Sequence, residues 1–148
     1  MNQKNILGSS LQICSKNPVT GFHRDGYCRP NSNDKGKHYV CGLMNKDFLN
    51  FTASKGNDLS SVVKPGDKWC LCEDRFEEAY NAGKAPKVIN NATHKNTKNT
   101  VKNILLKEGF ENKNKIDPGN IFVFISSLFF IDLCFLGAKY TKSLKKLI

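Results

Sequence analysis

The chain has 148 residues, with 23 basic and 13 acidic side chains and a formal net charge of +10. This length suits one folded domain and is too short for two well-built ones. The basic residues are spread along the whole chain rather than gathered into a stripe interleaved with aromatic residues. Nucleic acid is therefore not an expected partner.

The six cysteines and the N-terminal segment together predict the cellular compartment. The first ten residues lack the continuous apolar stretch that a secretory signal requires. We therefore expect a cytoplasmic protein that is not secreted, whose cysteines stay as thiols, bind metal or react transiently rather than cross-link the fold. These cysteines are Cys14, Cys28, Cys41, Cys70, Cys72 and Cys134.

Residues 5–46 are predicted to be mainly irregular, because glycine, proline, asparagine and aspartate recur through them. One strand is expected to interrupt this segment at residues 38–44. Its alternation places Tyr39, Cys41 and Leu43 on one face. Cys41 is therefore expected to be at least half buried.

The next predicted element is a helix that begins after Asn45 and ends near Gly56. An asparagine side chain can accept a hydrogen bond from the first turn of a helix, and glycine readily adopts the conformation that follows a helix end. The residues expected to face inward are Phe48, Leu49 and Phe51.

A short strand ending at Cys72 and a second helix follow. The strand is predicted to place Trp69 and Leu71 on one face and Cys70 and Cys72 on the other. The helix begins right after Cys72, where a cluster of acidic residues suits the positive end of the helix dipole. It is expected to stop at Gly83.

A third strand is expected at residues 87–90 and a third helix at residues 100–107, with Gly109 as its stop. The sequence therefore predicts an α+β fold: a single compact domain with short strands, about three short helices and long loops, over residues 1–110. A polar linker, an apolar segment and a basic tail are expected to follow, at residues 111–120, 121–138 and 139–148.

Residues 121–138 form an apolar block of 18 residues. As a helix this block would be about 27 Å long, just enough to cross a thin membrane. Placing Asp132 in a membrane costs about 2.5–3.5 kcal/mol, which is less than the roughly 4–7 kcal/mol gained from the apolar side chains. The block therefore predicts either a membrane anchor, with the domain on the cytoplasmic side, or a buried apolar helix.

A cluster of nitrogen and sulfur ligands makes zinc the candidate cofactor. The close pairs are only His38-x-x-Cys41 and Cys70-x-Cys72, whereas zinc ribbons and fingers normally carry paired C-x-x-C motifs. Buried free thiols are the alternative. The candidate metal ligands are Cys28, His38, Cys41, Cys70 and Cys72.

The same residues allow a catalytic interpretation, with Cys41 or Cys72 as nucleophile and His38 or His94 as base. Cys72 precedes a helix whose dipole favours a thiolate, but the acidic residues that follow it, beginning with Glu73, oppose one. Whether the chain is an enzyme is left open at this point.

Polar groups suited to a small-molecule site are also present. Turns account for several of them without any ligand, and a lone tryptophan more often serves as a core residue. The candidate ligand-binding residues are Arg24, Asp25, Asn57, Asp58 and Trp69.

Several motifs resemble the family catalogued as domain of unknown function number twenty-two thirty-seven, which is known mainly from bacteria. They are NILGSSLQICSKNPVTGFHRDGYC at residues 5–28, KGKHYVCGLMNKDFL at 35–49, GNDLSS at 56–61, KPGDKWCLCEDRFEEAYNAGKAPKV at 64–88 and ATH at 92–94. The resemblance implies one compact domain and brings no assigned activity. The apolar segment after residue 110 is not part of the family pattern.

The resemblance also implies that most candidate site residues occupy family motif positions. These residues are Cys14, Arg24, Asp25, Cys28, His38, Cys41, Asn57, Asp58, Trp69, Cys70, Cys72 and His94. Three functions are compatible with them: a Cys/His-lined site for a metal or small ligand, a thiol-dependent enzyme, and a structural or adaptor domain tethered to a membrane through residues 121–138.

Overall fold

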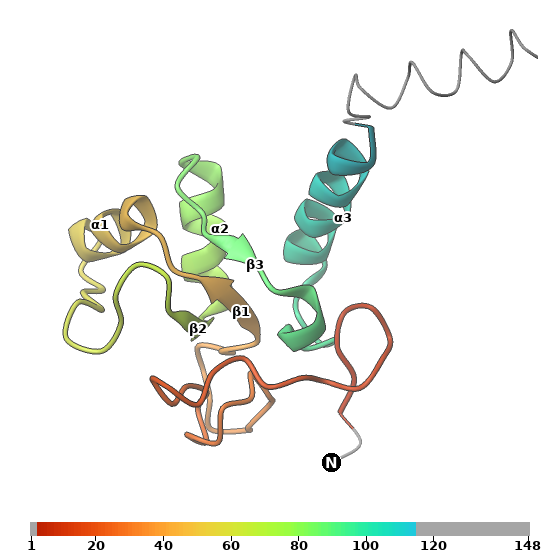
Figure 1. Ribbon diagram of the computed structural model, residues 1–148, viewed down its shortest axis with the longest axis horizontal. Coiled ribbons are helices and arrows are strands. Elements are labelled where there is room, and N and C mark those ends of the chain that lie inside the picture. Colours follow the sequence, from red (N-terminus) through yellow and green to blue (C-terminus); the bar gives the residue numbers. More distant parts are fainter. Residues whose placement is uncertain (1–2, 115–148) are drawn as a thin grey trace, which may run out of the picture. The chain divides into compact units, whose positions relative to one another are not determined.

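The computed structural model describes residues 3–114, with side chains described through residue 107 (Figure 1). Apart from the end of α3, the helices and strands belong to the first of two compact units, Met1–Lys107 and Glu108–Ile148. In chain order they are β1 (Val40–Leu43), α1 (Lys46–Ser54), β2 (Lys68–Leu71), α2 (Glu73–Asn81), β3 (Lys87–Val88), the short 3-10 helix η1 (Asn90–Ala92) and α3 (Asn99–Asn114).

The strands form one antiparallel sheet in the order β2-β1-β3, and with the three α-helices this confirms an α+β fold. The segment before β1 is irregular, as predicted, and has only isolated bridges. The three predicted strands are present, and none extends beyond the residues predicted for it. Because β1 lies in the middle, one edge of β2 is left unpaired by the described strands, and the candidate site lies along this edge.

The two faces of the sheet bury different kinds of residue. On the face toward the helices, Val40 and Leu71 are cross-strand partners, and Trp69 lies opposite Gly42. A side chain at Gly42 would place its Cβ 2.9 Å from Cδ1 of Leu71, so only glycine leaves room for that packing. The main apolar core on this face consists of Val40, Met44, Phe48, Val63, Trp69, Leu71, Phe76, Ala79, Val101 and Leu105.

The opposite face is fastened to the N-terminal loops by two disulfides, Cys14–Cys41 and Cys28–Cys70. Figure 1 shows these loops on the far side of the strands from α1 and α2. The expectation that the cysteines remain free thiols is therefore wrong for four of them. Compartment arguments could not show that the two loop cysteines reach Cys41 and Cys70, which face each other across β1 and β2.

Helix starts agree well with the sequence predictions, and one helix end does not. Asn45 caps α1, with its side chain accepting a hydrogen bond from the backbone N–H of Phe48 at 2.7 Å. The second helix begins directly after Cys72, as expected. The third continues through Gly109 to Asn114, because a single glycine costs a helix interior only about 1 kcal/mol and does not have to end it.

Within residues 3–114, no helix is long and apolar enough to cross a membrane. The predicted apolar segment at 121–138 and the basic tail at 139–148 lie outside the described residues. The predicted linker at 111–120 is described only for residues 111–114, which continue α3. The domain boundary near residue 110 therefore stays a prediction.

Candidate functional site

A cleft follows the unpaired edge of β2, and we refer to it as the β2-edge cleft. It consists of two adjoining cavities of about 360 and 170 Å³ that share His38, Leu59, Trp69 and Cys70. Residues from both faces of β2 reach it because no strand within residues 3–114 pairs with β2 on this side. The further lining residues are Gly21, Phe22, Arg24 and Val62 in the larger cavity and Asn57, Leu71, Cys72 and Arg75 in the smaller.

Two of the predicted catalytic residues meet in this cleft. A Cβ on Gly36 would lie 2.9 Å from Cε1 of His38 and 3.4 Å from Sγ of Cys72, so both side chains border the same small backbone position. Among the described residues, Cys72 is the one cysteine outside a disulfide, and it is partly exposed. Glycine at position 36 therefore keeps an imidazole and a thiol close together.

His38 is held by a buried carboxylate that the sequence analysis missed. Oδ1 of Asp34 lies 2.7 Å from Nδ1 of His38, and Oδ2 accepts the backbone N–H of His38 at 2.8 Å. Asp34 is only 4% exposed. Because an ionised carboxylate can only accept hydrogen bonds, Nδ1 carries the proton, and Nε2 of the neutral ring is left with its lone pair. The D-x-x-x-H spacing was the one available sequence signal.

The acidic residues after Cys72, which seemed to oppose a thiolate, are engaged by Lys98. Its ammonium pairs with Asp74 at 2.7 Å and with Glu77, and its backbone N–H donates to Oε1 of Glu73 at 2.6 Å. The hydrogen bond from Lys98 lowers the pKa of Asp74. Among the described residues no side chain caps the N-terminus of α2, where Cys72 is the N-cap residue and the backbone N–H of Glu73 donates to the carbonyl oxygen of Gly36 at 3.3 Å. Cys72 therefore lies at the positive end of the helix dipole.

An arginine covers the aromatic wall of the cleft. The guanidinium of Arg24 lies 5.0 Å from the centre of the Trp69 ring, and Arg24 has a left-handed backbone φ of 54°. Trp69 is 8% exposed, so it serves as a core residue and as cleft wall at once. Within residues 3–107, no carboxylate pairs with Arg24. Arg75, on the other side of the cleft, pairs with Glu78 at 3.0 Å.

The other predicted ligand-binding residues divide into two groups. Asn57 lines the cleft, and its side-chain N–H donates to Thr52 at 2.8 Å. Asp25 and Asp58 do not line it. Burial raises the pKa of Asp25, but hydrogen bonds from Arg29 and from a backbone N–H outweigh it and lower that pKa overall.

Asp58 belongs to a turn. Its Oδ1 accepts the backbone N–H of Ser60 at 2.8 Å, and this hydrogen bond lowers the pKa of the Asp58 carboxyl. The turn explanation that the sequence offered is therefore sufficient for Asp58. The same holds for Asp25, which accepts the backbone N–H of Tyr27 and pairs with Arg29 at 2.6 Å.

The alternative catalytic pair is not assembled. Cys41 is in a disulfide and has no thiol to ionise. His94 is 1% exposed, and both ring nitrogens are used: Nδ1 accepts the backbone N–H of Asn96 at 3.1 Å, and Nε2 lies 2.6 Å from Oε1 of Gln3. Burial lowers the pKa of His94. His94 therefore fastens the N-terminal segment and has no nitrogen left to act as a base.

The predicted zinc ligands do not form one centre in this structure. Cys28, Cys41 and Cys70 are in disulfides, whereas the side chains of His38 and Cys72 are not and line the β2-edge cleft, which Cys70 also borders. A disulfide sulfur carries no negative charge and is not the thiolate that zinc binds. The sulfur atoms of Cys28 and Cys41 are instead clustered with that of Cys14, within 4.8 Å of one another, a grouping that the sequence analysis missed.

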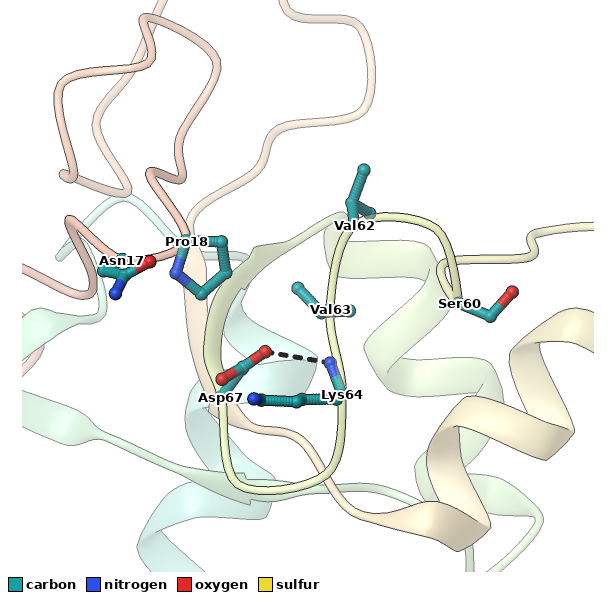
Figure 2. Close-up of a pocket in the computed structure, with 7 residues that line it drawn as sticks. All are labelled: Asn17, Pro18, Ser60, Val62, Val63, Lys64 and Asp67. Carbon is teal, nitrogen blue, oxygen red and sulfur yellow. Dashed lines mark hydrogen bonds between the residues drawn. The ribbon is translucent and has the colours of Figure 1, made fainter.

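A second hollow of about 350 Å³ adjoins the cleft beyond Val62, which lines both (Figure 2). Its floor is the turn from Lys64 to Asp67, in which Oδ2 of Asp67 accepts the backbone N–H of Lys64 at 2.9 Å. Figure 2 shows Asn17 and Pro18 on the opposite wall. Its lining offers no thiol or imidazole, and its one carboxylate, that of Asp67, accepts the turn hydrogen bond.

Comparison with known proteins gives a family but no activity. No curated protein matches the chain. The sequence pattern of the family described as an uncharacterized protein conserved in bacteria (DUF2237) matches residues 4–109. This range includes every residue that lines the β2-edge cleft and all four disulfide cysteines. The chain therefore belongs to the DUF2237 family.

Proposed function

We propose that this protein is a thiol-dependent enzyme in which Cys72 is the nucleophile, His38 the base, and Asp34 the residue that positions His38. The single observation that carries the proposal is the convergence of His38 and Cys72 on Gly36, with the imidazole oriented by a buried carboxylate. A thiol, a base and an orienting acid are the three parts of known cysteine catalytic sites.

The chemistry follows from the positions of these groups. Nε2 of His38 takes the proton of Cys72, and the sulfur attacks an electrophilic carbon bound in the cleft. A carbon–sulfur bond forms, the leaving group departs with the bonding electrons, and water then releases the product from Cys72. The N-terminus of α2, at which Cys72 is the N-cap residue, favours negative charge beside the sulfur. His38 and Cys72 make no direct hydrogen bond here, which is common before substrate binds.

Arg24 supplies the basis for substrate selection. Its guanidinium lies over Trp69 in the larger cavity, and no carboxylate of residues 3–107 neutralises it. Guanidinium groups bind carboxylates and phosphates through paired hydrogen bonds. A cavity of about 360 Å³ suits a small molecule. The substrate class is thus a small organic anion with an acyl or similarly electrophilic carbon.

The test uses the oxidised full-length chain and two chromogenic esters, para-nitrophenyl acetate and para-nitrophenyl hydrogen succinate. We expect a burst of nitrophenolate, with an acyl group on the peptide that contains Cys72 in mass spectrometry. Cys72→Ser should lose the burst. His38→Asn should slow it about 100-fold, which is the lower range for removal of a general base.

Arg24→Gln tests the anion selection separately. It should reduce the preference for succinate over acetate about tenfold while leaving the acetate burst unchanged, since it removes one charged hydrogen-bond donor. Arg29→Gln is the matched control, because Arg29 pairs with Asp25 and does not line the cleft. No acylation of Cys72 by either ester would contradict the enzyme proposal and favour a binding or structural role.

A further inference from the structure

Four cysteines that take no part in the proposed chemistry of Cys72 form one buried cluster: Cys14, Cys28, Cys41 and Cys70. Cys41 and Cys70 are directly opposite each other on β1 and β2, and each is bonded to a cysteine of the N-terminal loops. All four residues are at most 3% exposed, and Ala92 completes the cluster. The sulfur atoms of Cys14, Cys28 and Cys41 lie within 4.8 Å of one another, so the two disulfides are adjacent.

Three of the four sulfur atoms have a spacing close to that of a tetrahedral zinc site. Zinc bound by four thiolates has zinc–sulfur distances of about 2.3 Å, which place the sulfur atoms about 3.8 Å apart. Three of the sulfur atoms here already lie within 4.8 Å of one another, and the fourth, on Cys70, is bonded to one of them. Breaking both disulfides would therefore leave three thiols near zinc-binding spacing, and the thiol of Cys70, which lies outside this 4.8 Å group, would have to move toward them.

The backbone around the cluster is fixed independently of the disulfides. The backbone N–H of Cys41 donates to Thr93 at 3.0 Å, and that of Cys70 donates to Thr20 at 2.8 Å. The N–H of Cys14 donates to Gly26 at 2.8 Å. These hydrogen bonds do not involve the sulfur atoms, so they would still position three of the four cysteines after reduction.

We infer that the reduced chain binds one zinc ion through Cys14, Cys28, Cys41 and Cys70, and that the disulfide and zinc forms are alternative states of this cluster. Two molecules of a dithiol reductant supply four electrons and four protons, break both disulfides and become disulfides themselves. Zinc then binds the four thiolates and releases the four protons. The inference is independent of the proposed enzyme, because Cys72 takes no part.

The zinc form suits a reducing environment. In a reducing compartment structural disulfides do not persist, whereas clustered thiolates are typical zinc ligands. Metal binding then supplies folding free energy in place of the cross-links. The N-terminal loops would remain fastened to the sheet in either state.

The test is zinc analysis of the full-length chain, kept in mild detergent, after reduction with dithiothreitol and removal of excess metal. About one zinc per chain is expected in the reduced form and none in the oxidised form. Cobalt in place of zinc should give the charge-transfer absorption of four thiolate ligands. Zinc should also raise the unfolding temperature of the reduced chain above its value in chelator.

Variants locate the ion. The Cys72→Ser, Cys134→Ser double variant should keep the full zinc content, and Cys14→Ser should lose at least nine-tenths of it. The cobalt spectrum of the unmodified chain does not depend on whether Cys14→Ser folds. The inference is overturned by a reduced chain without zinc, by a cobalt spectrum with fewer than three thiolates, or by zinc that is lost with Cys72 and Cys134.

Discussion

Replacing Asp34 with asparagine keeps the shape of the side chain and removes the charge on which the orientation of His38 depends. Both carboxylate oxygens accept hydrogen bonds from His38, at 2.7 and 2.8 Å. An amide has one oxygen, so one of the two donors would face an NH₂ group. A hydrogen bond to a charged group contributes about 1.5–3 kcal/mol, and a neutral one about 0.5–1.5 kcal/mol.

Asp34→Asn should therefore lower the free energy of unfolding by about 2–3 kcal/mol. This value is near the low end of the combined loss from the two hydrogen bonds, because the His38 ring is 39% exposed and can turn to water. Its amide also favours the ring tautomer with a proton on Nε2, which cannot accept the proton of Cys72. The ester burst at pH 7 should fall about 100-fold.

Urea titration measures the first effect, and stopped-flow absorbance of nitrophenolate measures the second. In alkaline buffer hydroxide can take the place of the general base, so the burst of Asp34→Asn should approach that of the unmodified chain. A variant that loses stability but keeps its burst rate at pH 7 would refute the positioning role and leave Asp34 as a structural residue.

Three other predictions concern the fold. The Cys28→Ser, Cys70→Ser double variant removes a cross-link over 42 residues and should lose about 4 kcal/mol of the unfolding free energy under oxidising conditions; a loss below 1 kcal/mol in urea titration would argue against the disulfide. Burial lowers the pKa of His94 below 6.5 in the folded chain, so the unfolded chain binds its proton first and stability is lost as pH falls below about 6.5. His94→Gln should show a smaller loss between pH 7.5 and pH 5, and an unchanged loss would contradict the assignment. Gly21→Ala would place a Cβ 2.3 Å from the carbonyl oxygen of Tyr27 at a φ of 87°, so it should cost at least about 2 kcal/mol, and an unchanged unfolding temperature would show that the loop is not closed this way.

Local signals in the sequence were sufficient for most of the fold. Asn45 and the residues after Cys72 define helix starts through chemistry that acts within one turn, and alternation placed Trp69 and Leu71 on the core face. The end of α3 was predicted wrongly, because one glycine in a helix is a small penalty that neighbouring turns can outweigh.

The disulfides were not predictable in the same way. They join loops to strands over 27 and 42 residues, and only the folded chain brings these cysteines together. Sequence patterns without an alignment do not report such long-range proximity. The compartment argument then favoured free thiols, which the reduced state described above would restore.

For the site, the sequence supplied the reactive residues but not their partners. Cys72 and His38 were both named as catalytic candidates, yet only the structure chooses them over Cys41 and His94. Asp34 falls in the segment predicted to be mainly irregular, and its role depends on burial, which sequence spacing does not reveal.

The reactivity of Cys72 in the folded chain tests the central claim most directly. The measurement is the rate of its alkylation by iodoacetamide at pH 7, resolved by peptide mass spectrometry, for the oxidised chain in buffer and in urea. An isolated cysteine is only a few per cent thiolate at this pH. We predict that folding accelerates alkylation about tenfold and that His38→Asn removes the acceleration. Slower alkylation in the folded chain than in the unfolded one would mean that Cys72 is an inert, half-buried thiol, and would contradict the account.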